Sequence, residues 1–388
     1  MEHTTKEHEE FEISETRTMQ TNGAKIKAIG VGGGGGNMIN HMIEEGINNI
    51  DLIVANTDAQ ALESSKAPFK IQLGAELTKG LGAGMQPSVG KDAALESYSE
   101  IKDMLSGADI VFISAGLGGG TGTGAAPIVA QAAQEVGALT VSIVTSPFKF
   151  EGKKRTLLAK NGLAALKQES DSIIVVPNEK LLSISEKSLG VKDSFKLADN
   201  ILAQAVGGIS RVILSHGNND INLDFADVRT VMSHRGLALM GTGYSSGANA
   251  AYDAAKAAIE SPLLENVSIN GAMGVLVHFD IHPAYPILEI SEAMAIIEDS
   301  ADDEASVIFG ITTNSDLAED EVRITIIATG FEDENAIPEP TTKKKKPTLA
   351  TPSDELMVLQ KKAVVGGYNN IDSDDRLDVP TFLRKQMD

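Results

Sequence analysis

The stretch Leu117-Gly118-Gly119-Gly120-Thr121-Gly122-Thr123-Gly124-Ala125 decides how the rest of this sequence is interpreted. The β-branched run 110–113 precedes it, and a helix-forming segment over residues 125–136 follows it. Glycines between a strand and a helix let several backbone N–H groups face one concavity, and the helix N-terminus adds partial positive charge. The two threonines add hydroxyl donors. A tight turn explains one or two glycines but not five, so this stretch predicts a phosphate-binding loop.

The composition limits the classes of protein that this chain can be. Its 388 residues are enough for two domains with tails, and an apolar content of 42% supports hydrophobic cores. The absence of cysteine excludes disulfides and thiolate metal sites and fits a reducing cytoplasm. The net charge of −21 argues against nucleic-acid binding. Neither a signal peptide nor an apolar run of membrane-spanning length is recognisable, so we expect a cytoplasmic protein without membrane insertion.

Strands and helices alternate along the first half of the chain. The expected strands are 25–31, 50–55, 110–113, 139–144 and 172–176. This pattern predicts an α/β fold with a Rossmann-like parallel sheet, in which a ligand lies beyond the carboxyl ends of the strands.

Three glycine-rich loops follow these strands or lie between them. They are residues 32–37, residues 80–84 and the organising stretch 117–125. We expect the three loops to meet at one ligand. Residues 30–35 also fit the pattern G-x-G-x-x-G, which leaves a dinucleotide-dependent oxidoreductase as an alternative.

A long central helix is predicted over Val191–Leu214, because apolar residues recur there at helical spacing. A polar loop at 217–229 then leads into a smaller α/β domain, expected to reach residue 330. Its expected strands are 274–279, 306–311 and 322–329, and its expected helices are 248–259 and 287–298.

Both ends of the chain are predicted to be disordered. Residues 1–24 are polar, acidic and without periodicity. Prolines surround a run of four lysines in the segment 331–374, which indicates a flexible linker. The lysine run could contact anionic lipid, but in this setting a solvated spacer is the preferred interpretation. Apolar and basic residues return in 375–388, which is typical of a docking peptide.

Seven short motifs occur in an order that resembles the FtsZ family of bacterial tubulin-like cell-division GTPases. The motifs are 32–37, Asn56-Thr57-Asp58, 80–84, Gly118-Gly119-Gly120-Thr121-Gly122-Thr123-Gly124, Phe150-Glu151-Gly152-Lys153-Lys154-Arg155, 222–229 and Asp378-Val379-Pro380-Thr381-Phe382-Leu383-Arg384-Lys385. The resemblance implies a tubulin/FtsZ-type GTP-binding domain at 25–190, a central helix at 191–216 and an activating domain at 217–330.

The resemblance also implies which residues hold GTP or GDP. The glycine loops would bind the phosphates through backbone N–H groups. The implied loop residues are Gly33, Gly34, Gly35, Gly36, Asn37, Gly119, Gly120, Thr121, Gly122, Thr123 and Gly124. Glu151 would accept a hydrogen bond from a ribose hydroxyl, and Arg155 would add positive charge beside the phosphates. Without the resemblance, these two residues are a surface ion pair of the i, i+4 type.

Guanine selection is expected to involve Phe195, Asp199 and Asn178. Phe195 and Asp199 share one face of the central helix. The ring would stack on the base, and the carboxylate would accept from guanine N1–H and N2–H₂, a donor pair that adenine lacks. Asn178 could bind O6 or a neighbouring edge. The alternative is a core phenylalanine with a solvent-exposed aspartate.

Asn222, Asp224 and Asp227 are the candidate catalytic residues. Asp224 could instead cap a helix, with Asp227 in its first turn. The loop lies some 30 Å from the nucleotide face, since about 20 helical residues separate them. The resemblance implies that these residues enter the site of the next subunit in a head-to-tail filament, where they position water and cation. Magnesium with the nucleotide is implied, and a monovalent cation is a further candidate. A filament without turnover is the remaining alternative.

The resemblance also implies a cellular role and binding partners. The filaments would form the cytokinetic ring at the mid-cell division site, on the inner face of the membrane. Phe382 and Leu383 would anchor membrane-tethering adaptors, with Arg384 and Lys385 as charged contacts.

His278, Asp280 and His282 alternate along the sequence and could form a metal site. Pro283 follows at once and no fourth ligand is evident, so separate polar roles are the preferred interpretation.

Overall fold

The structure is a computed structural model of the chain. It describes residues 23–331, except 48, 185–189, 215–223, 235, 262–263, 265–268 and 270. The expected N-terminal arm, Asn222, and the expected linker and docking peptide beyond residue 331 therefore lie outside the described residues.

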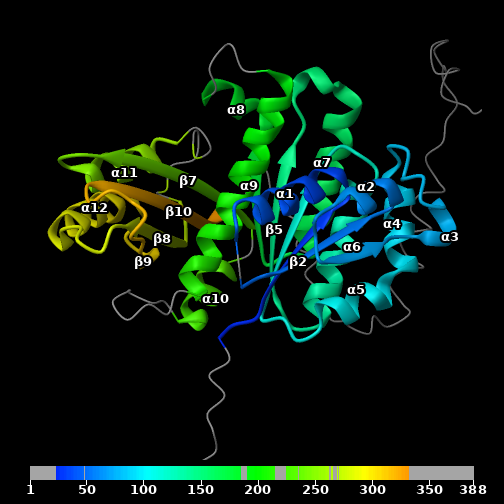
Figure 1. The fold of residues 1–388 in the computed structure, drawn as a ribbon, viewed down its shortest axis with the longest axis horizontal. Coiled ribbons are helices and arrows are strands. Elements are labelled where there is room, and N and C mark those ends of the chain that lie inside the picture. The colour runs from blue at the N-terminus through cyan, green and yellow to red at the C-terminus, as the bar shows by residue number, and fades with distance from the viewer. Residues whose placement is uncertain are drawn as a thin grey trace, which may run out of the picture. The chain divides into compact units, whose positions relative to one another are not determined.

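One ten-stranded sheet runs through the described part of the chain, with the strand order β3-β2-β1-β4-β5-β6-β7-β10-β8-β9. Neighbouring strands from β3 to β7 are parallel, β10 is antiparallel to both β7 and β8, and β8 is parallel to β9. The predicted Rossmann-like parallel sheet is thereby confirmed (Figure 1). The strands are β1 (Ile26–Val31), β2 (Asp51–Asn56), β3 (Phe69–Gln72), β4 (Ile110–Gly116), β5 (Leu139–Ser146), β6 (Ser172–Pro177), β7 (Gly236–Ser246), β8 (Gly274–Ile281), β9 (Ser306–Thr313) and β10 (Glu321–Phe331).

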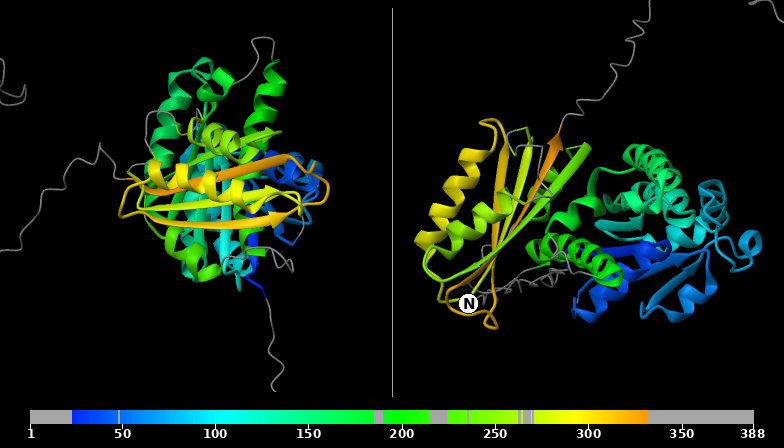
Figure 2. Two further views of the ribbon diagram at one scale, coloured as in Figure 1. Left: turned by 90° about the vertical axis from the view of Figure 1, so that its left-hand side faces the viewer. Right: turned by 90° about the horizontal axis from the view of Figure 1, so that it is seen from above.

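Helices cover the sheet and carry the loops of interest at their ends. The predicted long helix is confirmed as α9, with the expected bounds. The helices are α1 (Gly32–Glu44), α2 (Ala59–Ser64), α3 (Ala75–Thr78), α4 (Pro87–Glu96), α5 (Tyr98–Leu105), α6 (Thr121–Glu135), the 3₁₀ turn η1 (Lys149–Glu151), α7 (Lys153–Gln168), α8 (Asn178–Ile184), α9 (Val191–Leu214), α10 (Phe225–Met232), α11 (Ala250–Ile259) and α12 (Ile287–Ser300). Figure 2 shows α11 and α12 together on one face of the C-terminal strands.

The C-terminal strands continue the N-terminal sheet and do not form a separate one. Three residue pairs join β6 to β7, from Ser172 with Gly236 to Ile174 with Ala238. The sequence pattern did not predict β7, because several glycines interrupt the run of residues that would indicate a strand. A Cβ on Gly243 would lie 1.8 Å from the carbonyl oxygen of Ala254 in α11, so close helix–sheet packing requires the glycine.

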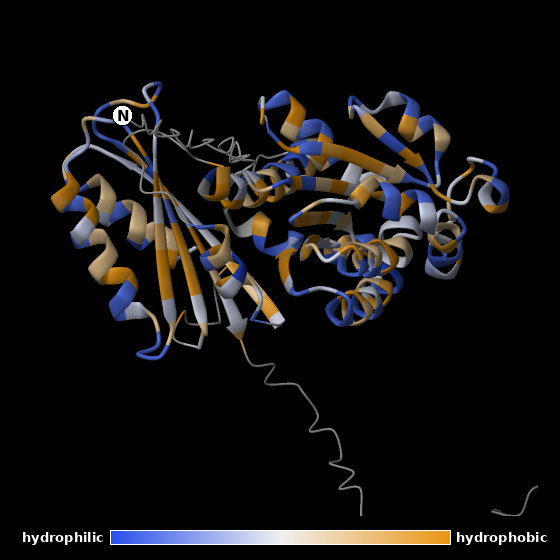
Figure 3. Cartoon of the chain, turned by 90° about the horizontal axis from the view of Figure 1, so that it is seen from below, coloured by the Kyte–Doolittle hydropathy of each residue, from blue (hydrophilic) through white to orange (hydrophobic). Residues whose placement is uncertain are grey.

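The helix α9 packs against both halves of the sheet. It contacts α1 and β5 on one side and β8 and β9 on the other. Its buried residues include Leu202, Val206 and Ile209, which belong to one hydrophobic cluster with residues of β1, β4, β7 and β8. Figure 3 shows the apolar residues concentrated along the strands and the inner faces of the helices. One hydrophobic cluster therefore runs from the glycine-rich half into the C-terminal half.

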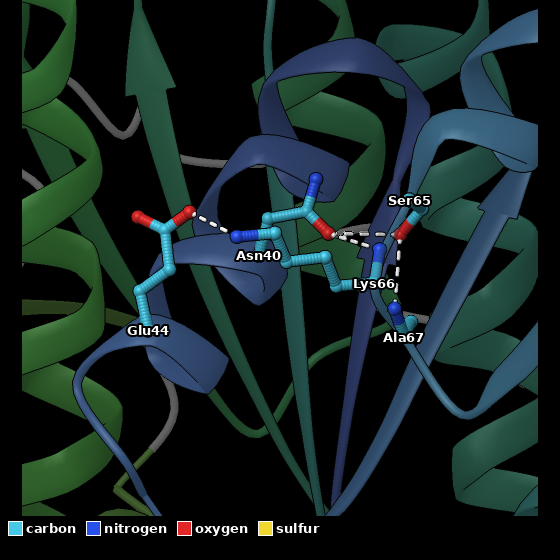
Figure 4. A network of polar contacts seen from close by, with 5 residues as sticks. All are labelled: Asn40, Glu44, Ser65, Lys66 and Ala67. Atoms are coloured by element: carbon cyan, nitrogen blue, oxygen red, sulfur yellow. Dashed lines mark hydrogen bonds and ion pairs between the residues drawn. The ribbon is translucent and has the colours of Figure 1, made fainter.

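A polar network fixes the segment after α2 to helix α1 (Figure 4). Asn40 Oδ1 accepts hydrogen bonds from Ser65 Oγ and Lys66 N, both at 2.9 Å. Lys66 Nζ lies 2.7 Å from the Glu44 carboxylate, and this ion pair lowers the pKa of Glu44. Because α1 carries the first glycine loop at its start, these contacts set the position of that loop relative to β3.

Candidate active site

The glycine-rich loops meet at the carboxyl ends of β1, β2 and β4. Thr57 Oγ1 and Thr121 Oγ1 lie 2.7 Å apart, and the N–H of Gly82 donates to the Thr57 carbonyl at 3.2 Å. A Cβ on Gly32 would lie 2.9 Å from the backbone nitrogen of Gly122. Loops that lie far apart in the sequence thus lie against one another at this edge of the sheet, as the sequence predicts.

The second half of the organising stretch, from Thr121 to Ala125, forms the first turn of α6. The helix begins at Thr121, four residues before the expected start at Ala125, so that expectation was wrong. Gly118 has φ of +102°, and its N–H donates to Thr123 Oγ1 at 2.8 Å. Thr123 is buried and shapes the loop through this bond, and the Thr121 hydroxyl pairs with Thr57. The backbone N–H groups are then the main donors left for an anion.

The glycines of the loops divide into two groups. A Cβ on Gly33 or Gly119 would meet nothing within 4 Å, so these positions face open space. A Cβ on Gly35 would lie 2.3 Å from the Ser114 carbonyl oxygen, and one on Gly124 would lie 2.0 Å from the Pro87 carbonyl oxygen. The remaining predicted glycines are also close to other groups: Gly34 to Gly116, Gly36 to Val54, Gly120 to Ala83 and Gly122 to Gly116. At most of these glycines a side chain would therefore meet neighbouring atoms, whereas Gly33 and Gly119 have open space in the direction of a Cβ.

Glu151 and Arg155 are partners of each other. One Glu151 carboxylate oxygen accepts from the Phe148 N–H at 2.9 Å, and the other accepts from the Arg155 guanidinium. The ion pair that the sequence left as an alternative is thus present. Asn37 is exposed in α1. A ribose hydroxyl that approaches Glu151 would have to share the carboxylate with these two donors.

Phe195 is part of an aromatic cluster and is not a core residue. Its side chain is 39% exposed, and its ring stands perpendicular to the ring of Phe148 with the centroids 5.2 Å apart. Phe150 stacks on Phe148 at 4.9 Å and is 66% exposed. The core alternative for Phe195 is therefore wrong. Sequence reasoning missed Phe148 and gave Phe150 no role of its own within the motif 150–155, although two phenylalanines separated by one residue are conspicuous in a chain that is only 4% aromatic.

Two polar groups near the start of α9 are poorly satisfied by the protein itself. Burial raises the pKa of the Asp199 carboxyl to about 6, against the opposing effect of the nearby His41 charge. Asn178 follows β6 directly and is 4% exposed, and its Oδ1 is buried with no hydrogen-bond partner among the described residues. A buried amide without a partner is unusual, and a ligand with polar edges would supply one.

Asp224 and Asp227 lie at the other end of α9. Asp224 is the N-cap of α10 and accepts from the Ala226 N–H at 3.2 Å, which confirms its capping role. Asp227 is exposed in the first turn of α10. The 24 residues of α9 span about 36 Å, and Figure 1 shows α8 at one end of that helix and α10 at the other. The two acids are therefore remote from the glycine loops of their own chain.

The alternating residues of β8 have separate partners. His278 Nε2 is 2.9 Å from Thr312 Oγ1, and the Ala284 N–H bonds to His282 Nδ1. Within the described ranges, no group of three or more histidine or acidic side chains is placed to hold a metal ion. None of the helices that the structure describes is long and apolar enough to cross a membrane.

The parallel sheet and the glycine loops at its edge are those of a GTPase of the tubulin type, as two family matches show. A family model described as the Tubulin/FtsZ family GTPase domain matches residues 25–186, and one described as the FtsZ family C-terminal domain matches residues 236–332. An FtsZ from M. jannaschii, described as an empty dimer, is 44% identical with a TM-score of 0.76, over 80% of this chain and 89% of the relative. The chain belongs to the FtsZ family of cell-division GTPases and binds guanine nucleotide.

A more distant protein shares the fold. CetZ1 from Haloferax volcanii, described as a GDP-bound monomer, is 19% identical with a TM-score of 0.69, over 80% of this chain and 95% of that chain. Identity at this level supports the architecture only. The family matches do not favour the dinucleotide-dependent oxidoreductase that the pattern at residues 30–35 left open.

Proposed function

We propose that this GTPase polymerises head-to-tail, and that the acidic loop of one subunit completes the GTP site of the next. This proposal rests on the distance that separates Asp224 and Asp227 from the glycine loops of the same chain. The two exposed acids lie at one end of a subunit, and the phosphate site lies at the opposite end. A contact between these two different surfaces is heterologous, so it repeats from subunit to subunit and builds a filament. The description of the M. jannaschii relative as a dimer supports association between copies.

In this proposal the acids act by position and charge. Asp227 and Asp224, with Asn222, would orient the attacking water and a cation as the γ-phosphoryl group leaves. Phosphate oxygens and water would supply ligands for magnesium beside the acids, since Mg²⁺ in nucleotide sites takes one or two carboxylates together with substrate phosphates and several waters. A monovalent cation at the same interface belongs to the proposal. GTP hydrolysis would then weaken the contact between subunits.

Guanine recognition is assigned to the start of α9. Phe195 would stack on the base beside Phe148 and Phe150, because 39% of its side chain remains exposed within the aromatic cluster. Asp199 would accept from the two guanine donors, and the unpartnered amide of Asn178 would bind a neighbouring base edge. Asn37 and the Glu151–Arg155 pair would contact the rest of the nucleotide.

The decisive experiment measures phosphate release per subunit against protein concentration, with light scattering in parallel. We expect specific activity near zero at low concentration and a rise where scattering appears, because a neighbour must supply the acids. Activity that is independent of concentration would contradict completion of the site by a second copy. Filaments that scatter light but release no phosphate would favour the alternative of a structural filament.

Replacing Asp199 by alanine is expected to relax the choice of base. A two-donor contact discriminates by roughly 1–3 kcal/mol, so the ratio of GTP to ATP affinity should fall by about 5- to 150-fold. Equilibrium binding of both nucleotides measures this ratio. Asp193→Ala is the matched control, because Asp193 is an exposed acid in the first turn of the same helix. An unchanged ratio in Asp199→Ala would remove Asp199 from base recognition.

The pH dependence of GTP affinity provides a second readout for Asp199. The guanine donors need the ionised carboxylate, whose pKa in the unliganded protein is about 6. We expect the wild-type Kd, relative to that of Asp199→Ala, to rise about tenfold per pH unit below pH 6, because binding then releases one proton. The pKa of the Asp199 carboxyl is higher in the folded protein than in the unfolded chain. Its ionisation therefore lowers the free energy of unfolding as the pH rises through 6. Asp199→Asn should therefore stabilise the unliganded protein at pH 8 but not at pH 4.

We also propose that the filaments act in the cytokinetic ring at mid-cell and recruit membrane-tethering adaptors through residues 375–388. The apolar residues Phe382 and Leu383 beside Arg384 and Lys385 support this role. Deleting residues 378–388 should leave GTP-dependent assembly unchanged and abolish localisation at mid-cell. Loss of assembly in the truncated chain, measured by sedimentation, would instead make the peptide a structural element.

A further inference from the structure

A groove opens on the side of the GTPase half that faces away from α9. It lies between α4 and α7, with α6 as its floor, and encloses about 500 Å³. Two close approaches form its inner end. A Cβ on Gly124 would lie 2.0 Å from the Pro87 carbonyl oxygen, and one on Gly162 would lie 2.4 Å from Thr123 Cγ2. The glycines bring the three helices together there.

The apolar part of the groove lining is aliphatic, and the polar side chains of Gln131, Asn161 and Gln168 also line the groove. Its apolar surface comes from Pro127, Ile128, Leu158 and Ala165. None of the described residues that line it is aromatic. From Thr123 to Gln131 the floor extends about 12 Å along α6, which is the length of an extended medium-chain acyl group. Clefts of this size with mainly apolar walls bind small molecules.

The charges at the groove differ between its two ends. Lys91 and Ser88 of α4 line the inner end, beside Gly124, and Lys91 forms no ion pair with another described residue. Glu169 lies seven residues beyond Gly162, about 10 Å further along α7. A ligand with one negative charge would therefore place it beside Lys91, because Glu169 repels an anion at the outer end.

The inner end of the groove is also the underside of the phosphate-binding loop. Thr123 and Gly124 line the groove, and Thr123 Oγ1 accepts the hydrogen bond from Gly118 that closes the loop. A molecule that fills the groove stabilises the arrangement of α4, α6 and α7 in which that bond is formed. Binding in the groove and binding at the loop are then coupled, and the coupling is reciprocal.

We propose that this groove is a second ligand site, which takes a medium-chain acyl carboxylate and tightens nucleotide binding on the other side of α6. The carboxylate lies between Lys91 and Ser88, and the acyl chain lies along Pro127, Ile128 and Ala165. The coupling rests on the proposed role of the loop in phosphate binding, whereas the site itself does not.

Calorimetric titration of the full chain with decanoate tests the site. Ala165→Phe fills the groove and should weaken binding at least tenfold, and Ala164→Phe, one residue away on the exposed face of α7, should not change it. Lys91→Gln should weaken binding several-fold, and Lys160→Gln, an exposed lysine outside the groove, is its control. Octanoate should bind roughly tenfold more weakly than decanoate, because two methylenes leave the apolar wall.

Three results would overturn parts of the proposal. Equal binding by the two phenylalanine variants would place decanoate elsewhere, and equal binding by decanol and decanoate would remove the role of Lys91. For the coupling, saturating decanoate should lower the Kd of GDP by about fivefold or more, and GDP should lower the Kd of decanoate by the same factor. An unchanged Kd of GDP would overturn the coupling. These isotherms need neither filaments nor turnover, so they remain decisive even if head-to-tail catalysis fails.

Discussion

Asp227→Ala is expected to bind GTP and assemble like the wild type while its GTP turnover falls roughly 100-fold or more. Groups that orient a nucleophile in the transition state contribute effects of this order. Asp227 is exposed and follows the N-cap of α10, so its loss removes neither a core contact nor the cap. Phosphate release measures turnover, and sedimentation with GTP measures assembly. Loss of GTP binding would contradict a role for Asp227 on a neighbouring subunit.

Two comparisons sharpen the result for Asp227. Asp224→Asn keeps a capping side chain, so it should lose turnover without the cost of about 0.5–2 kcal/mol that removal of an N-cap carries. Asp253→Ala changes an exposed acid in the first turn of α11 and should leave turnover unchanged.

Mixing two inactive variants tests whether the acids act on the next subunit. Gly119→Glu places a carboxylate in the open space above the loop, where it repels phosphate, but keeps Asp227. Mixed with Asp227→Ala, it should restore part of the turnover, because its acids can complete the intact site of the other variant. No restoration, despite co-sedimentation of both variants, would favour a site contained in one chain.

Gly35→Ala is expected to destabilise the protein by about 3 kcal/mol or more, because its Cβ would overlap backbone atoms that cannot move independently. The added carbon would lie 2.3 Å from the Ser114 carbonyl oxygen in β4 and 2.8 Å from the Gly30 carbonyl carbon in β1. Relief requires the two central strands to separate from α1. The thermal unfolding midpoint without nucleotide measures the effect.

Gly33→Ala, two residues earlier in the same turn, is the matched variant. Its Cβ meets nothing within 4 Å, so the unliganded protein should unfold at the wild-type temperature. We expect its Kd for GTP to rise, because the methyl group enters the space assigned to the phosphates. A wild-type midpoint for Gly35→Ala would contradict the close strand–helix approach. Wild-type GTP affinity for Gly33→Ala would place the phosphates away from Gly33.

Local patterns in the sequence predicted much of the fold and the approximate site. β-branched runs indicated β1, β2, β4, β5 and β6, and helical periodicity predicted α9 with its observed bounds. Glycines at the ends of buried strands indicated a phosphate concavity, because few other structures require so many of them there. These features depend on neighbouring residues along the chain, so the sequence alone carries them.

The tertiary structure decided what depends on contacts between distant segments. Only the packing of α11 against β7 explains why a strand contains Gly241 and Gly243, and only the pairing of β6 with β7 joins the two halves into one sheet. The same holds for the difference between Gly33 and Gly35, and for the groove behind α6, where three helices supply the lining. The physical reason is that a residue's own conformational preference is local, whereas the atoms that surround it come from segments brought together by the fold.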